Sequence, residues 1–327
     1  MMQVITARFR LVQRRREDSR RMKEREGRGR VPVRTVGELP PAEELWRLTP
    51  KALLRALGLS ARKGLSQSFL TDSYVVKDIL AAAELAPEDE VLEVGPGLGV
   101  MTRELVKVVR RVVAVELDQK LAELLPTLVP APERLEVVNA DILEFDLASA
   151  FPGPYKVVAN LPYHISSPLL RKLLTSEKKP TLLVIMVQKE VAERMVAKLG
   201  STSLLSIMVQ LYSRASLVRE VPAAAFFPAP QVDSAVVKLE VYEQLPYGVD
   251  DPEAVLKVVA AGFSRRRKQI HNALSDSLWF PPGGVYEVLE RAGIDPARRA
   301  QTLSLEEWAT LYRTYQEARR GWQEKSE

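Results

Sequence analysis

The segment from Val91 to Val100 reads VLEVGPGLGV and contains the pattern that decides the fold. It passes from an apolar run directly into three glycines at alternate positions, Gly95, Gly97 and Gly99. Glycine lets the backbone turn sharply and lets a ligand approach it, because it carries no Cβ. A strand, a glycine turn and a helix in this order are typical of nucleotide-binding α/β folds, although such turns also serve structure alone.

Apolar runs alternate with amphipathic stretches on both sides of this turn. Continuous apolar strands separated by helices indicate a mostly parallel sheet that is covered on both faces, so the predicted fold class is α/β. Strands are predicted at 90–94, 111–118, 134–143 with its loop, 156–160, 181–188 and 234–242. Helices are predicted at 100–110, 119–129, 167–176, 189–199 and 203–213, and two more, around a polar link, within 50–85.

The two ends of the chain differ from this central part. Residues 1–60 are predicted to be a basic N-terminal extension, partly disordered or helical, because their beginning lacks a sustained apolar period. Residues 61–243 contain the alternating pattern, and residues 244–327 contain helical patterns with no further strand. The sequence therefore predicts an α/β domain followed by a small all-helical domain.

Composition excludes several classes of protein. Cysteine is absent and there are only two histidines, so no metal site is predicted, and the lack of thiols fits a cytoplasmic protein. No apolar run reaches the ~18 residues of a membrane span, so no membrane partner is expected. Residues 1–30 hold ten Arg and one Lys against four acidic residues, whereas the whole chain has a net charge of only +5. Overall basicity is therefore weak support for a nucleic-acid partner.

Acidic residues near the glycine turn indicate the type of cofactor. Glu116 ends the next predicted strand, where a carboxylate can accept both hydroxyls of a ribose, and Asp141 follows the third strand and can meet an adenine edge. Glu93 lies two residues before Gly95. The chain has no phosphate-binding lysine after the glycines, and the acids suit a positively charged cofactor without phosphates. We therefore predict S-adenosylmethionine, with NAD as the alternative.

The tetrapeptide Asn160-Leu161-Pro162-Tyr163 follows the fourth predicted strand, at the same sheet edge as this cofactor. The lone pair of an aromatic amine is delocalised, and the amine attacks better when acceptors hold its two hydrogens in a pyramidal arrangement. The Asn160 side-chain oxygen and the Leu161 carbonyl are candidates for these acceptors. Pro162 fixes the turn, and Tyr163 can stack on a base. Methyl transfer is then mainly a matter of positioning.

A second aromatic wall is predicted at Phe226 and Phe227, which precede a loop stiffened by Pro228 and Pro230. Such a rigid edge could pin an extruded base against Tyr163. The alternative is that the phenylalanines are ordinary core residues.

The order of these motifs resembles the KsgA-type small-subunit ribosomal RNA adenine dimethyltransferases over roughly 63–311. The segments that carry the resemblance are QSFL, EVGPGLG, AVELD, NADIL, NLPYHISSPLL, MVQKEVAERMVA, FFPAPQVDSAVVKLEV, FSRRRKQIHNAL and LSLEEW. The resemblance implies a Rossmann-like methyltransferase domain. It also implies dimethylation, from S-adenosylmethionine, of two adjacent adenosines in a hairpin near the 3′ end of small-subunit rRNA, and recognition of an immature subunit. We expect the enzyme to be a monomer.

The resemblance also implies roles for individual residues. Phe226, rather than Phe227, takes the stacking position beside the catalytic Asn160, Leu161, Pro162 and Tyr163. The residues expected at the cofactor are Gln67, Ser68, Leu70, Glu93, Gly95, Gly97, Glu116, Asp141, Ile142 and Asn160. Ser68 stands where the family usually has asparagine, and the loop around Gly200 is somewhat shorter than in the family.

Four consecutive cations, Arg265, Arg266, Arg267 and Lys268, are predicted at a helix start and have the density of a phosphate-binding strip. Further cations that could extend the strip are Lys63, Arg171, Lys172, Arg194 and Lys198. The alternative is a solvated helix. Two other functions stay open: a large-subunit rRNA adenine methyltransferase of the resistance type, and a non-catalytic ribosome assembly factor.

Overall fold

The computed structural model describes residues 42–45, 47–61 and 67–324, which belong to one compact unit. The predicted basic extension at 1–60 lies mostly outside the described residues. Its described part contains two short helices, α2 (Ala42–Leu45) and α3 (Pro50–Ala56). None of the described helices is both long and apolar enough to cross a bilayer.

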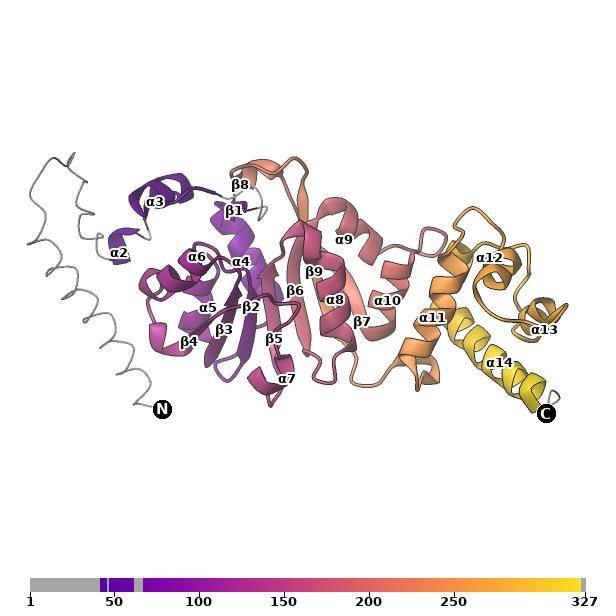
Figure 1. Ribbon diagram of the computed structural model, residues 1–327. Coiled ribbons are helices and arrows are strands. Elements are labelled where there is room, and N and C mark those ends of the chain that lie inside the picture. Colours follow the sequence, from indigo (N-terminus) through magenta and orange to yellow (C-terminus); the bar gives the residue numbers. More distant parts are fainter. Residues whose placement is uncertain (1–41, 46, 62–66, 325–327) are drawn as a thin grey trace, which may run out of the picture. The chain divides into compact units, whose positions relative to one another are not determined.

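A seven-stranded sheet forms the centre of the protein, with the strand order β4-β3-β2-β5-β6-β9-β7 (Figure 1). Its strands are β2 (Glu90–Val94), β3 (Arg111–Glu116), β4 (Leu135–Asn139), β5 (Lys156–Asn160), β6 (Leu182–Gln188), β7 (Ser213–Val221) and β9 (Ser234–Val241). The first five run parallel, β9 is antiparallel to β6, and β7 is antiparallel to β9. The predicted mostly parallel sheet is confirmed.

Helices cover both faces of this sheet, which explains why its central strands are apolar at almost every position. One core contains residues of α7 (Leu147–Ala150), α8 (Ser166–Thr175), α9 (Lys189–Met195) and α10 (Leu204–Tyr212). The core on the other face contains residues of α4 (Ser73–Ala82) and α5 (Thr102–Val108). Side chains that alternate along β2 divide between the two cores, as Leu92 and Val91 do.

Strand β7 is missing from the sequence prediction. Its segment SRASLVREV has few apolar residues, because β7 lies at the edge of the sheet and most of its side chains are exposed or half-exposed. The register shifts between Leu217 and Arg219, which further disturbs the alternation by which a strand is recognised.

The chain after Val241 is helical in its described part, as predicted. Figure 1 shows its helices together beyond α10: α11 (Pro252–Phe263), α12 (Ile270–Ser277), α13 (Gly284–Arg291) and α14 (Leu305–Glu324). Gly262 of α11 lies against Trp308 of α14, whose side chain is fully buried. The apolar core of these helices is continuous with the core under α8 and α10.

We expect Gly262→Ala to destabilise the protein, because a Cβ at this position would lie 2.4 Å from Trp308 Cη2. Overpacking of this kind costs about 1–3 kcal/mol. The control is Gly321→Ala in α14, where a Cβ would have no atom within 4 Å. Thermal unfolding should show a lower Tm for the first variant, and an unchanged or higher Tm for the second. Equal Tm values for the two variants would contradict the packing.

Candidate active site

The glycine turn joins β2 to α5 in a conformation that requires glycine. Gly95, Gly97 and Gly99 have φ angles of +64°, +56° and +72°, a region that favours glycine. A Cβ at Gly97 would lie 3.1 Å from the ring of Phe69, and a Cβ at Gly95 would lie 3.9 Å from the Pro162 ring. The turn is therefore held between the segment before α4 and the turn that follows β5.

A cavity opens beside this turn, at the carboxyl ends of the parallel strands. Every predicted catalytic or cofactor residue except Glu93 lines it: Gln67, Ser68, Leu70, Gly95, Gly97, Glu116, Asp141, Ile142, Asn160, Leu161, Pro162, Tyr163 and Phe226. Parallel strands bring their carboxyl ends to one edge, so motifs that are far apart in the sequence meet there. Sequence reasoning missed the apolar residues of the lining: Phe69, Leu98, Met101, Leu117 and Ile165. Their positions within or next to the motifs were the only signal from which they could have been predicted.

Glu116 is fixed against the glycine turn by backbone amides. Gly97 N donates to its Oε2 at 3.1 Å, and Asp118 N donates to its Oε1 at 2.9 Å. Burial raises the pKa of Glu116, and these hydrogen bonds act in the opposite direction. The carboxylate is thus positioned at the end of β3, next to the amide of Gly97.

Asp141 forms a local turn after β4, in which Leu143 N donates to its Oδ1 at 2.8 Å. Lys172 holds the following loop by donating to the carbonyls of Ile142, Leu143 and Phe145, at 3.0, 2.8 and 2.6 Å. Lys172 therefore shapes this side of the cavity.

The segment Gln67–Leu70 is tied across the opposite side of the cavity. Gln67 Nε2 donates to Asp118 Oδ2 at 3.1 Å. Strand β1 (Phe69–Leu70) pairs with β8 (Phe226–Phe227), with Leu70 opposite Phe226. This pairing brings the QSFL segment and the FFPAP segment, which are about 150 residues apart, to one wall.

The side chain of Asn160 is oriented by the backbone of Ser68. Asn160 Nδ2 donates to the Ser68 carbonyl at 3.4 Å, so the amide nitrogen faces that carbonyl. No group in the described part of the chain donates to Asn160 Oδ1 or to the Leu161 carbonyl, while Leu161 N donates to Met186 O at 3.0 Å. Two acceptors thus remain available on consecutive residues at the cavity.

The two aromatic residues at the cavity are held differently. The Tyr163 hydroxyl bonds to Ser234 Oγ at 2.8 Å, which joins the NLPY turn to the start of β9. Phe226 is 5% exposed and lines the cavity, whereas Phe227 packs against the cluster around α3 and does not line it. The choice of Phe226 over Phe227 agrees with this placement. Ser234 was not predicted, although it ends the FFPAPQVDS motif.

Glu93 lies behind the cavity. Its side chain is fully buried in β2 near Thr102, and neither carboxylate oxygen has a partner within hydrogen-bond distance in the described part of the chain. Burial raises the pKa of Glu93 from 4.5 to about 8. The raised pKa favours the protonated form of Glu93 near the glycine turn, and a positive charge nearby would favour its ionised form.

The cationic run was predicted at a helix start, and this prediction is wrong, because residues 264–269 form a turn between α11 and α12. All four cations are exposed on this turn. Arg265 and Lys268 approach Asp276 at 3.5 and 3.8 Å. Arg266 and Arg267 have no ion-pair partner in the described part of the chain. A turn projects consecutive side chains in several directions, so Arg266 and Arg267, which do not pair with Asp276, can meet an anion.

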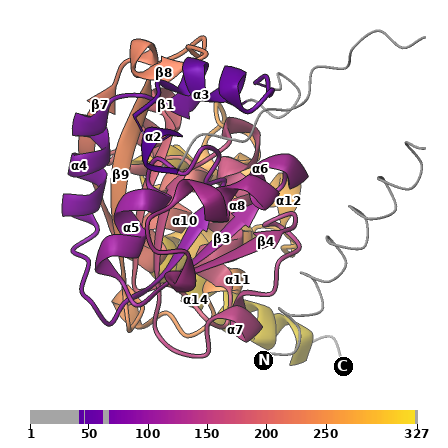
Figure 2. The same ribbon diagram turned by 90° about the vertical axis from the view of Figure 1, so that its left-hand side faces the viewer.

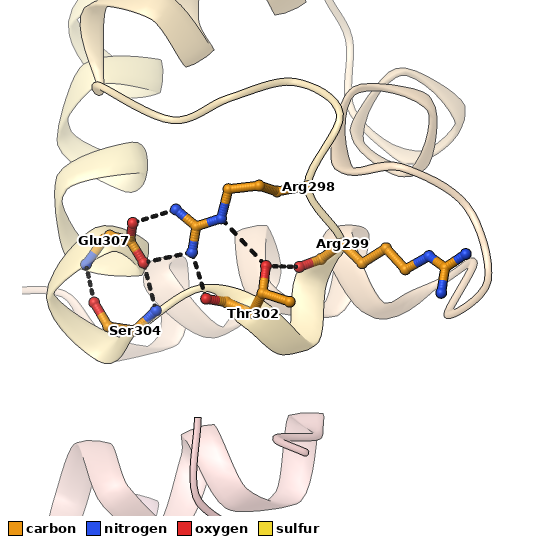
Figure 3. Close-up of polar contacts among 5 residues, drawn as sticks. All are labelled: Arg298, Arg299, Thr302, Ser304 and Glu307. Carbon is orange, nitrogen blue, oxygen red and sulfur yellow. Dashed lines mark hydrogen bonds and ion pairs between the residues drawn. The ribbon is translucent and has the colours of Figure 1, made fainter. Parts of the chain in front are cut away.

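A polar network around Arg298 lies just before and at the start of α14 (Figure 3). Arg298 makes two contacts with the Glu307 carboxylate and also bonds to the Thr302 hydroxyl and carbonyl. Ser304 and Glu307 cap the start of α14 reciprocally, at 2.7 and 3.1 Å. Ile270 N donates to the Arg298 carbonyl at 2.7 Å, which fixes the start of α12. Arg298 is therefore used structurally.

The other candidate cations do not form one strip. Arg171 pairs with Glu253 at 3.1 Å, and Lys63 lies outside the described residues. Lys198 is exposed on the short loop around Gly200, which bonds to the helical region through Gly200 N and the Gln301 carbonyl at 2.9 Å.

Comparison with known proteins identifies the family. The family described as "Ribosomal RNA adenine dimethylase" matches residues 58–317. The chain belongs to this family. A relative from Dehalococcoides mccartyi, named ribosomal RNA small subunit methyltransferase A, is 47% identical over 270 residues, or 82% of this chain and 92% of the relative. A relative of the same name from Moorella thermoacetica is 42% identical over 277 residues, or 81% of this chain and 96% of the relative.

Solved structures agree with this assignment. A dimethyladenosine transferase from Plasmodium falciparum is similar with a TM-score of 0.68 at 28% identity, over 76% of this chain and 98% of that one. The 23S rRNA methyltransferase ErmE is similar with a TM-score of 0.62 at 29% identity, over 75% and 98%. The predicted Rossmann-like fold, S-adenosylmethionine as the cofactor, and rRNA adenine methyltransferase activity are thereby confirmed.

We expect Glu93 to make stability depend on pH in the ligand-free protein. Its folded-state pKa of about 8 exceeds the ordinary value of 4.5, so the folded state binds a proton that the unfolded state releases between these values. Stability from this group is complete below pH 4.5 and is lost as the pH rises through 8. The Tm of Glu93→Gln minus the Tm of wild type should therefore become more positive as the pH rises from 5 to 8.5. The control, Glu306→Gln on the exposed face of α14, should follow wild type. A constant Tm difference for Glu93→Gln would contradict the assignment.

Proposed function

We propose that this enzyme dimethylates the 6-amino groups of two adjacent adenosines in a hairpin near the 3′ end of small-subunit rRNA, during ribosome biogenesis. The proposal rests on two acceptors at the cavity beside the glycine turn, Asn160 Oδ1 and the Leu161 carbonyl, to which no described residue donates. The names of the relatives at 37–47% identity support the small subunit as the source of the substrate.

The residues around the cavity fit S-adenosylmethionine, which supplies a methyl group on a positively charged sulfur when bound. The glycine turn leaves no Cβ on its ligand side, and the Glu116 and Asp141 carboxylates suit a ribose and an adenine edge. Glu93 supplies a buried carboxyl group without a partner, which a nearby cationic group would stabilise in its ionised form. Gln67 to Leu70 would close the pocket over the adenosine part.

The substrate amine is held by Asn160 and Leu161 in this mechanism. Asn160 Oδ1 and the Leu161 carbonyl each accept one hydrogen of the amino group, which favours a pyramidal nitrogen with its lone pair turned toward the donor. Pro162 has no N–H that could compete for these acceptors. Tyr163 and Phe226 enclose the flipped base, and the Ser234 contact to the Tyr163 hydroxyl sets the ring plane. No strong base is needed, because the nitrogen becomes acidic as it gains the methyl group.

The helical region at 244–327 binds RNA in this proposal, with the turn at 264–269 as its phosphate contact. The two open arginines of that turn, Arg266 and Arg267, support this role. We further propose that the enzyme acts as a monomer, in the cytoplasm, on an immature subunit.

A large-subunit rRNA is the second candidate substrate, and the likeness to ErmE favours it. That likeness is at 29% identity, against 47% for a relative named for the small subunit. A purely non-catalytic assembly role is disfavoured by the complete acceptor pair and glycine turn.

The deciding experiment incubates the protein with labelled S-adenosylmethionine and with unmethylated small subunits, large subunits or naked rRNA. Labelled dimethyladenosine in small-subunit rRNA supports the proposal. Label confined to the large subunit would assign the second function, and tight subunit binding without label would assign a non-catalytic role.

We expect Asn160→Ala to abolish methyl transfer, because it removes one of the two acceptors that hold the amine. The loss should be at least ~10²-fold in kcat, as for other preorganised polar contacts. Small-subunit affinity, measured by filter binding, should stay close to wild type. Asn272→Ala on the exposed side of α12 is the matched control and should keep full activity. Full activity of Asn160→Ala would refute the assigned role.

We expect the double variant Arg266→Ala/Arg267→Ala to weaken subunit binding, because it removes two open phosphate contacts. The slope of log K against log salt should fall by about 2, one for each contact. Arg319→Ala/Arg320→Ala, which removes two consecutive exposed arginines from α14, is the matched control. If both double variants bind alike, the turn does not contact the RNA backbone.

A further inference from the structure

A second, open groove lies on the far side of the wall formed by β1 and β8. Helix α3 borders it and lies beside these two strands in both views of the molecule (Figures 1 and 2). Helices α4 and α5 supply its other side. The groove encloses about 860 Å³, and no part of the proposed reaction uses it.

Cations dominate the charge of this groove. Among the described residues that line it, five are basic and one is acidic: Arg47, Lys51, Lys77, Arg103, Lys107 and Glu104. Lys107 Nζ neutralises Glu104 at 2.8 Å. Lys77 lies over the ring of Tyr74 at 5.5 Å, which leaves its charge intact. Arg47 and Lys51 are exposed and have no ion-pair partner in the described part of the chain.

Arg103 is the unusual member of this group. It lies in the first turn of α5, and its Nη1 is buried without any hydrogen-bond partner among the described residues. A guanidinium has five donors and stays protonated in proteins, so leaving it partly buried and unpaired costs free energy. Stability alone does not account for this arrangement, because a neutral side chain would avoid the cost. Arg103 is half-buried and lines the groove, so the other N–H groups of its guanidinium can meet an incoming anion there.

The groove also shares a wall with the active-site cavity. Leu70, Leu98, Val100 and Phe226 line both. A nucleotide whose base lies against Phe226 in the cavity would therefore have its neighbours in the strand close to the groove. Phosphates recur along an RNA strand, and the four cations of the groove other than Lys107, which are Arg47, Lys51, Lys77 and Arg103, match a polyanion better than a single small anion.

We propose that this groove binds the backbone of the RNA strand next to the target adenosine, with Arg103 contacting a phosphate. The inference rests on the proposed function in taking RNA as the substrate, but it does not depend on which subunit supplies the RNA. The contact would draw the strand along α3 and α5 and so help to keep the extruded base at Phe226 and Tyr163.

The test uses the full-length protein and three variants. Arg103→Gln removes the charge, Lys51→Gln removes an exposed cation of the same groove, and Arg319→Gln on α14 is the matched control. For each, the affinity for unmethylated small subunits is measured across a salt series, together with the Kd of S-adenosylmethionine and the Tm. If wild type methylates only the large subunit, the same series is run with large subunits.

We expect Arg103→Gln to weaken RNA binding about tenfold and to lower the salt slope by about 1, with unchanged affinity for S-adenosylmethionine and no fall in Tm. A structural role for Arg103 would instead lower the Tm. Lys51→Gln should also lower the slope, and it decides the question if Arg103→Gln does not fold. Arg319→Gln should match wild type.

Unchanged RNA affinity and salt slope in both groove variants would overturn the proposal. The proposal would also be overturned if inorganic phosphate raised the Tm of wild type but not of Arg103→Gln, while both proteins bound RNA with the same affinity. That result would assign the groove to a free anion. If wild type did not methylate RNA but the groove variants still weakened RNA binding, the proposed function would be contradicted and the groove proposal would stand.

Discussion

The orientation of one amide depends on one backbone carbonyl. Asn160 Nδ2 donates to the Ser68 carbonyl, and Asn160 Oδ1 has no donor in the described part of the chain, as the proposed mechanism requires. A rotated amide would present a donor to the substrate amine instead. This arrangement requires the segment Gln67–Leu70 to stay in place. The pairing of β1 with β8 and the Gln67 contact to Asp118 provide that support. The side chain at position 68 matters less for this contact than the backbone, so serine can occupy it without disturbing the amide.

Charge around the active site falls into two sets, with acidic side chains at the cavity and basic side chains outside it. Glu93, Glu116 and Asp141 lie at or behind the ends of the parallel strands. Basic side chains gather on the outer side of the β1–β8 wall and on the turn between α11 and α12. Phe226 and Leu98 line both the cavity and the groove, so apolar side chains stand between the carboxylates of the cavity and the cations of the groove.

Much of the site could be predicted because the chemistry is concentrated in short contiguous motifs. The glycine turn, Glu116 and the NLPY tetrapeptide each end a buried strand, and parallel pairing brings strand ends together without any further information. The edge strand β7 could not be predicted, since its exposure removes the apolar signal. The cationic run is predicted at a helix start, yet the chain turns there and α12 begins only at Ile270, whose backbone N donates to the Arg298 carbonyl.

The sequence by itself determined the α/β class and the cofactor type and marked Asn160 and Leu161 as candidate acceptors, because strand periodicity and motif chemistry are local properties. The tertiary structure decided which of these groups remain available. It engaged Lys172 and Arg298 in structural contacts. Among the described residues, it left Glu93 without a hydrogen-bond partner and Arg103, Arg266 and Arg267 without an ion-pair partner. Whether a charged side chain is paired depends on neighbours that are distant in the chain, and only folding brings those neighbours into contact.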